Sequence, residues 1–119
     1  MKEKSIHEKL TIEALEAYLS EHYCGWAQEQ SLFMKLVEEV GEVAEVLNKK
    51  AGRKQTDDAD LQEQLAVELA DILHYTVAIA AVNGIELDRI ILAKDKKATV
   101  KYHHERDLEA FLSEREKQA

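Results

Sequence analysis

The segment 65-LAVELADILHYTVAIAAV-82 decides how this chain folds. Almost every residue in it is apolar, so a helix with 3.6 residues per turn would have no polar face. Such a helix belongs either at the centre of a helical bundle or in a membrane. Glu68, Asp71 and His74 lie inside the segment, and these side chains would be very costly in lipid. The segment therefore predicts the central helix of a bundle and no membrane span.

Apolar residues at helical spacing also occur on both sides of this segment. They predict helices over about residues 6–23, 31–50, 61–82 and 86–102. The chain of 119 residues has no proline and only four glycines, so the residues that usually interrupt helices are scarce. We therefore expect an all-α fold in one domain over residues 1–119. This would be a four-helix bundle whose remaining apolar surface is covered by dimerisation.

The connections between these helices carry signals of their own. Residues 51–60 are polar, and Asp58 or Asp60 is placed to cap the helix that follows. The pair Asn83–Gly84 suits a left-handed cap at the end of that helix. Residues 103–119 are charged and are expected to form either a tail or one more helix.

The charge and the cysteine count limit the possible partners. The formal net charge is −8, whereas nucleic-acid binding needs a basic surface, so no nucleic-acid partner is expected. Cys24 is the only cysteine, which excludes an internal disulfide and a cysteine-rich zinc site. The first residues lack the apolar core of a signal peptide. We expect a cytoplasmic protein.

One acidic cluster lies on the predicted helix over residues 31–50. Glu38, Glu42 and Glu45 fall within an arc of roughly 60°, and Glu39 lies beside Glu42. A glutamate-rich helix face is usually just solvated. However, a solvated face usually has lysines interleaved at i+4, and no basic residue stands between Glu38 and Glu45. A solvated face and a metal site both remain possible for this cluster.

A second acidic pair lies in the central apolar helix. Glu68 and Asp71 are one turn apart and project from nearly the same side. A buried carboxylate without a partner is unfavourable, so these two need either a metal ion or a Lys or Arg from another helix. An all-oxygen cluster suits a hard cation, Mg²⁺ with Mn²⁺ as a possible substitute. Antiparallel packing of the two helices would bring both clusters together in a site that can bind substrate phosphates.

The two acidic elements together resemble a known family. The stretches 35-KLVEEVGEVAEVL-47 and 68-ELADILHYTVAIAAVNGIEL-87 are similar to the MazG-type nucleoside triphosphate pyrophosphohydrolases of the all-α NTP pyrophosphatase superfamily. That family carries the motifs E-E-x-x-E and, further along, E-x-x-D. They correspond here to residues 38–42 and 68–71. The resemblance covers about residues 26–102.

The resemblance implies an activity and a set of roles. Members of the family hydrolyse (deoxy)nucleoside triphosphates to a nucleoside monophosphate and pyrophosphate, and they work as homodimers or dimers of dimers. Their acidic residues bind Mg²⁺, and one of them activates the attacking water. Carried over to this chain, the implied residues are Glu38 and Glu39 for catalysis and Glu39, Glu42, Glu68 and Asp71 for the metal. The expected role is housecleaning of the nucleotide pool.

Substrate-binding residues are implied by a basic and aromatic segment, roughly K-x₃-N-x₂-K-Y, that often follows the third helix of this family. Lys94, Lys101 and Tyr102 match it, but Ala98 stands where the family has asparagine. Lysines on a helix are also found on ordinary solvated faces. Some relatives place an aromatic residue against the nucleobase before the acidic helix. The expected substrate-binding residues are Trp26, Lys94, Lys97, Lys101 and Tyr102.

The sequence also bears on three other functions. A ferritin-like di-iron bundle needs E-x-x-H on two helices, and no histidine of this chain follows a glutamate by three residues. The di-iron function is therefore set aside. A catalytically silent helical adaptor remains open, as does a phosphoribosyl-ATP pyrophosphohydrolase activity, which shares the fold of the resembled family.

Overall fold

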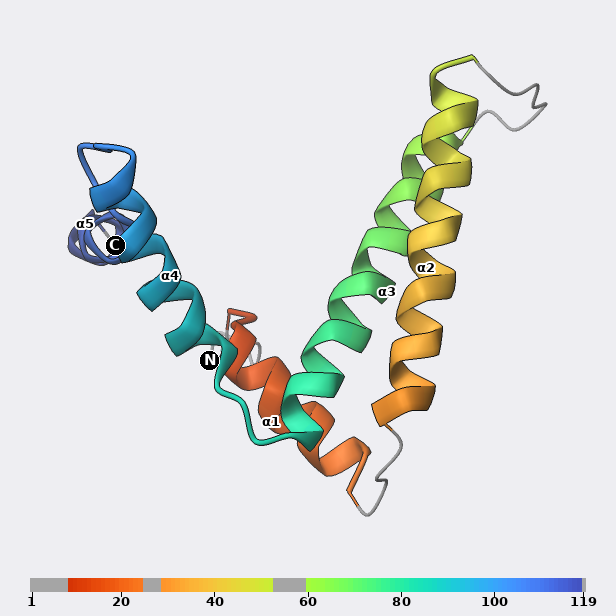
Figure 1. Ribbon diagram of the computed structural model, residues 1–119, viewed down its shortest axis with the longest axis horizontal. Coiled ribbons are helices and arrows are strands. Elements are labelled where there is room, and N and C mark those ends of the chain that lie inside the picture. The colour runs from red at the N-terminus through yellow and green to blue at the C-terminus, as the bar shows by residue number, and fades with distance from the viewer. Residues whose placement is uncertain (1–8, 25–28, 53–59, 119) are drawn as a thin grey trace, which may run out of the picture. The chain divides into compact units, whose positions relative to one another are not determined.

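The computed structural model describes residues 9–24, 29–52 and 60–118, and these residues form helices and no strand (Figure 1). The helices are α1 (Ile12–His22), α2 (Glu29–Lys50), α3 (Leu61–Val82), α4 (Leu87–Lys101) and α5 (Leu108–Gln118). The expected all-α fold is confirmed, and the charged C-terminal stretch is helical. The chain divides into two compact units, Met1–Ile85 with α1 to α3 and Glu86–Ala119 with α4 and α5.

The ends of α3 lie where the sequence predicts them, because both carry local caps. At the start, the Asp60 side chain accepts a hydrogen bond from the backbone N–H of Glu63 at 3.2 Å. At the end, Gly84 has φ +66°, a left-handed conformation that glycine adopts without strain. The N–H of Ile85 then reaches back to the carbonyl of Ala80 at 2.9 Å, which completes a Schellman motif.

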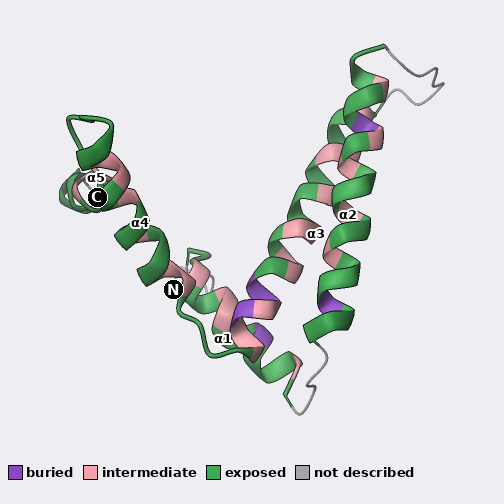
Figure 2. Cartoon of the chain, in the orientation of Figure 1, coloured by how far each residue is buried: buried purple, intermediate pink, exposed green. Residues whose placement is uncertain are grey.

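The core of the first unit is built around α3. The antiparallel helix α2 lies along α3, and α1 packs against it near its C-terminal end (Figure 1). Figure 2 shows that the buried positions of α3 are in this C-terminal half. The buried apolar residues of the described chain are Leu19, Leu32, Val46, Val77, Ala78 and Ala80. The N-terminal half of α3 is covered by α2 on one side only.

The central helix is therefore only partly covered within one chain. Leu69 and Leu73 of α3 are 47% and 58% exposed, although their neighbours face α1 and α2. By length and composition alone α3 could also cross a membrane. Its packing against two helices and its carboxylates Glu68 and Asp71 instead fit the core helix of a bundle.

The second unit is a helical hairpin. At the C-terminus of α4, the backbone N–H of His104 donates to the carbonyl of Thr99 at 3.0 Å, with His103 in the left-handed region at φ +57°. This Schellman motif turns the chain toward α5. The hairpin is held by side-chain contacts and has no fully buried residue in either helix.

Candidate metal centre

Three carboxylates meet between α2 and α3. Glu39 of α2 and Glu68 and Asp71 of α3 each offer an oxygen, and these oxygens all lie within 4.8 Å of one another. All three residues are half-buried. Glu39 points toward α3 because it shares a helix face with Leu36 and Val43, which are also half-buried against that helix. We call these three residues the carboxylate triad.

The triad is electrostatically strained without a cation. A hydrogen bond with Glu68, followed by burial and the nearby charges of Glu68, Asp71 and Glu38, raises the pKa of Glu39 to about 7. Two carboxyl groups can share a hydrogen bond only when one of them carries a proton, which is why the contact raises the pKa of Glu39. One oxygen of Glu68, Oε2, is nevertheless buried without a hydrogen-bond partner. The three carboxylates would therefore be stabilised by a positive charge placed between them.

Within residues 9–24, 29–52 and 60–118, no lysine or arginine supplies that charge. Among the ion pairs formed by the residues that the structure describes, none involves a member of the triad. The structural alternative, in which a basic side chain from another helix neutralises Glu68 and Asp71, therefore finds no support in the described chain. The orphaned oxygen of Glu68 and the all-oxygen donor set fit a hard divalent cation.

The remaining acidic residues of α2 lie outside the triad. Glu38 is exposed and pairs with Lys35 at 3.7 Å, one turn earlier on the same helix. Glu42 is exposed as well and is not part of the described three-carboxylate group. The structure thus brings together three of the carboxylates expected to share a pocket, while Glu38 and Glu42 flank them on the solvent side.

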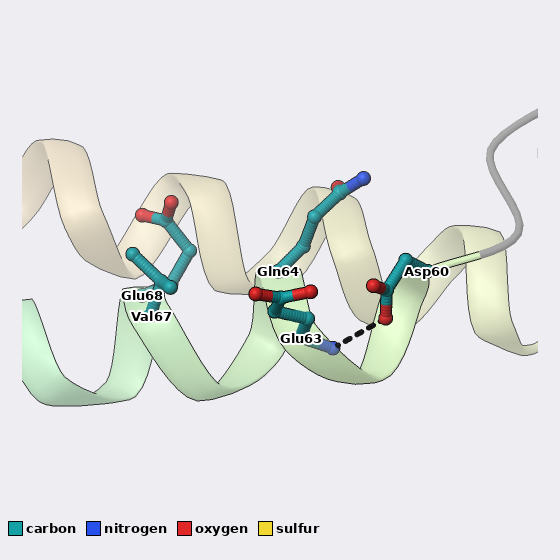
Figure 3. Close-up of a pocket in the computed structure, with 5 residues that line it drawn as sticks. All are labelled: Asp60, Glu63, Gln64, Val67 and Glu68. Atoms are coloured by element: carbon teal, nitrogen blue, oxygen red, sulfur yellow. Dashed lines mark hydrogen bonds between the residues drawn. The ribbon is translucent and has the colours of Figure 1, made fainter.

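A hollow of about 290 Å³ adjoins the triad (Figure 3). It is lined by Asp60, Glu63, Gln64, Val67 and Glu68, so Glu68 belongs to both features. The side chain of Asp60 hydrogen-bonds with that of Glu63 and thereby raises the pKa of Glu63. We did not expect Asp60 and Gln64 at this site. Their signal in the sequence is the four-residue spacing to Glu68, which places all three on one helix face.

Of the expected substrate-binding residues, the lysines share one face of α4. Lys94, Lys97 and Lys101 are exposed and fall within an arc of roughly 60°. Tyr102 follows the helix as its C-cap, and the ammonium of Lys101 lies 5.3 Å from its ring centroid. Trp26 lies outside the described residues.

A tyrosine that the sequence did not single out connects α1 to α3. The hydroxyl of Tyr23 lies 2.8 Å from Nε2 of His74, one turn beyond Asp71 on α3. Burial, and to a lesser degree the nearby Tyr75, raises the pKa of Tyr23. Because the two residues are far apart in sequence, only the packing of α1 on α3 reveals the contact.

The helical fold and the triad define an all-α protein with a carboxylate cluster that could hold a divalent cation, an arrangement suited to binding phosphorylated substrates. Residues 27–105 match the family model of the MazG nucleotide pyrophosphohydrolase domain. The chain therefore belongs to the MazG nucleotide pyrophosphohydrolase family, whose members typically depend on a divalent metal.

A solved structure agrees with this assignment. The crystal structure of iMazG from Vibrio DAT 722 superposes with a TM-score of 0.61 at 30% sequence identity. The alignment covers 82% of this chain and 100% of that chain. No curated protein matches the chain. The family match ends at residue 105, so α5 (Leu108–Gln118) follows the matched region.

Proposed function

We propose that this protein hydrolyses (deoxy)nucleoside triphosphates to a nucleoside monophosphate and pyrophosphate, with Mg²⁺ as the metal and Mn²⁺ as a possible substitute. The observation that carries the proposal is the carboxylate triad with its orphaned Glu68 oxygen. Membership of the MazG family supplies the reaction class. Such an activity suits removal of unwanted nucleotides from the cytoplasmic pool.

The residues of the chain divide the work as follows. Glu39, Glu68 and Asp71 would hold the metal, and Glu42, exposed one turn from Glu39, remains a further proposed metal residue. A bound divalent cation neutralises phosphate oxygens and makes water more acidic. The cation would take the place of the proton on Glu39. Metal affinity should therefore fall at pH values where Glu39 is protonated, which is below its pKa of about 7.

The carboxylates on the solvent side would handle the proton of the attacking water. In hydrolysis, the water oxygen bonds to the α-phosphorus, and the bond from that phosphorus to the α–β bridging oxygen breaks. Pyrophosphate leaves, and a carboxylate accepts the water's proton. We assign that proton acceptor to Glu38 or Glu39. Glu38 is exposed beside the triad, and Glu39 has a pKa near the working pH.

The substrate itself would be bound by charge and by stacking. The lysine face of α4, formed by Lys94, Lys97 and Lys101, offers three ammonium groups to the triphosphate. Tyr102 and Trp26 are the aromatic residues assigned to the nucleoside, since base stacking tolerates different bases.

We further propose that the enzyme is a homodimer or a dimer of dimers. At about 100° per residue, Val40 and Leu47 of α2 and Leu69 and Leu73 of α3 line one edge of the helix pair. All four are between 46% and 58% exposed. The triad and its flanking glutamates lie toward the opposite edge. An apolar edge of this kind is suited to a second copy, which would complete a four-helix bundle.

The test is a product analysis with purified protein. A panel of canonical and modified NTPs, dNTPs and phosphoribosyl-ATP is incubated with Mg²⁺, with Mn²⁺ and with chelator, and both products are separated by chromatography. We expect monophosphate and pyrophosphate as products. Turnover should disappear in chelator and in the Glu68→Gln variant. It should be retained in the control Glu13→Gln, which changes an exposed position on α1. A nucleoside diphosphate product, or no turnover of any compound, would refute the proposal.

A further inference from the structure

The two sides of α4 have different partners. Lys94, Lys97 and Lys101 form the exposed lysine face. At about 100° per residue, Asp95 and Thr99 point more than roughly 100° away from the middle of that face. Both are half-buried, and this is the side that α5 packs against. The lysine face is therefore left uncovered by α5.

A half-buried hydrogen bond to Asp95 links the two helices. Oδ2 of Asp95 accepts a hydrogen bond from the backbone N–H of Leu108, the first residue of α5, at 2.6 Å in a half-buried position. A carboxylate at a helix N-terminus satisfies an otherwise unpaired N–H and interacts favourably with the helix dipole. The second polar link, Lys96 to Glu109 at 3.4 Å, joins two side chains that are 57% and 62% exposed. An ion pair between such exposed side chains contributes little to the stability of the hairpin.

Helix α4 needs this support. It has 15 residues, no buried residue, and no side-chain hydrogen bond at its N-cap Glu86. A helix of this length is marginal on its own in water. Lys94, Lys97 and Lys101 also repel one another at spacings of three and four residues. The concentration of positive charge that would bind a triphosphate thus weakens the helix that presents it.

We propose that α5 is a brace that keeps the lysine face of α4 in its helical arrangement for phosphate binding, with Asp95 as the positioning residue. The inference rests on the proposed function, because the lysine face is taken to bind the triphosphate. α5 lies beyond the residues that match the family model. Asp95 acts through the lysines and does not touch the substrate.

The experiment compares three variants of the full-length protein. Asp95→Ala removes the acceptor, Asp95→Asn keeps an oxygen that can accept from Leu108, and Glu109→Gln removes the exposed interhelical pair. We expect Asp95→Ala to raise the KM for the preferred triphosphate about three- to tenfold with little change in kcat, the pattern of lost binding shared by ground and transition states. Asp95→Asn should recover most of the loss, and Glu109→Gln should match the wild type.

A double-mutant cycle separates the brace from general destabilisation. Lys97→Ala should raise KM several-fold in the wild type but have a clearly smaller effect in Asp95→Ala, because the two changes remove the same interaction. Additive effects would overturn the proposal, as would an unchanged KM in Asp95→Ala.

Hydrogen exchange gives a readout that does not depend on turnover. Amides of α4 and α5 should lose protection in Asp95→Ala and keep it in Glu109→Gln, while those of α3 stay unchanged. Unchanged protection in Asp95→Ala refutes the brace, even if the wild type turns over nucleotides. If the wild type turns over no nucleotide, the proposed function is refuted. The phosphate-binding role of the brace is then refuted as well, even if the amides of α4 and α5 lose protection in Asp95→Ala.

Discussion

Glu39 of α2 and Glu68 of α3 share a hydrogen bond between their carboxyl groups, across the packed face of two antiparallel helices. Two like charges would not be held in contact in a half-buried site unless a proton or a cation lay between them. Without metal, the raised pKa of Glu39 favours a proton in that place, and Oε2 of Glu68 is buried without a hydrogen-bond partner. A proton and a metal ion therefore compete for the triad, and either one would relieve the repulsion between its carboxylates.

The metal-free protein should lose stability as the pH rises. The pKa of Glu39 is raised from 4.5 to about 7, so the folded protein binds this proton more tightly than the unfolded chain does. That stabilisation is complete below about pH 4.5 and is lost as the pH rises through about 7. Urea unfolding in chelator between pH 5 and 8 measures it. Glu39→Gln should flatten the dependence, and Glu13→Gln should leave it unchanged. An equally steep dependence in Glu39→Gln would contradict the shared proton.

Asp71→Asn should abolish turnover and yet stabilise the metal-free protein. Removing one negative charge from the triad relieves both repulsion and desolvation, by about 1–2 kcal/mol. The same change removes an anionic ligand, so Mg²⁺ should raise the melting temperature of the wild type more than that of the variant. The measurement is a set of four melting curves, for each protein in chelator and in excess Mg²⁺. A variant that melts lower in chelator and still turns over substrate would show that Asp71 has a structural role.

Val40→Glu should weaken the proposed dimer, so that the protein dissociates into monomers. Val40 is 52% exposed on the apolar edge, where a buried charge would oppose the contact with a second copy. Met34→Glu is the matched control, because Met34 is 61% exposed on the same helix but lies roughly 120° away around it. Sedimentation velocity at micromolar concentration should show dissociation only for Val40→Glu. A wild-type monomer with full activity would refute the dimer.

Tyr23→Phe should weaken the docking of α1 on α3. The variant removes the hydroxyl that lies 2.8 Å from Nε2 of His74 and leaves a half-buried imidazole without that partner. The expected loss is about 1 kcal/mol in the free energy of unfolding. Tyr18→Phe is the control, since Tyr18 is 63% exposed. Chemical denaturation of the three proteins measures the difference, and equal stabilities for all three would show that the contact contributes nothing.

The helices could be predicted from the sequence because their causes are local. The bounds of α3, 61–82, follow from the cap at Asp60, the left-handed Gly84 and the largely apolar run over residues 65–82. These signals act over a few residues and need no tertiary partner. The two acidic motifs were recognisable for the same reason, as residue types at fixed helical spacing.

The tertiary structure alone decided which glutamate of α2 joins the metal centre. From the sequence, Glu38, Glu39 and Glu42 could all reach the site, because the apolar face of α2 is broad and does not fix the rotation of the helix. In the structure only one side of that face packs on α3, with Leu36 and Val43, so Glu39 turns inward and Val40 stays exposed. The rotation of a helix about its axis is set by the surfaces that pack against it, and a broad apolar face can serve two partners. The pairing of Tyr23 with His74 was likewise beyond the sequence, because only packing brings such distant residues together.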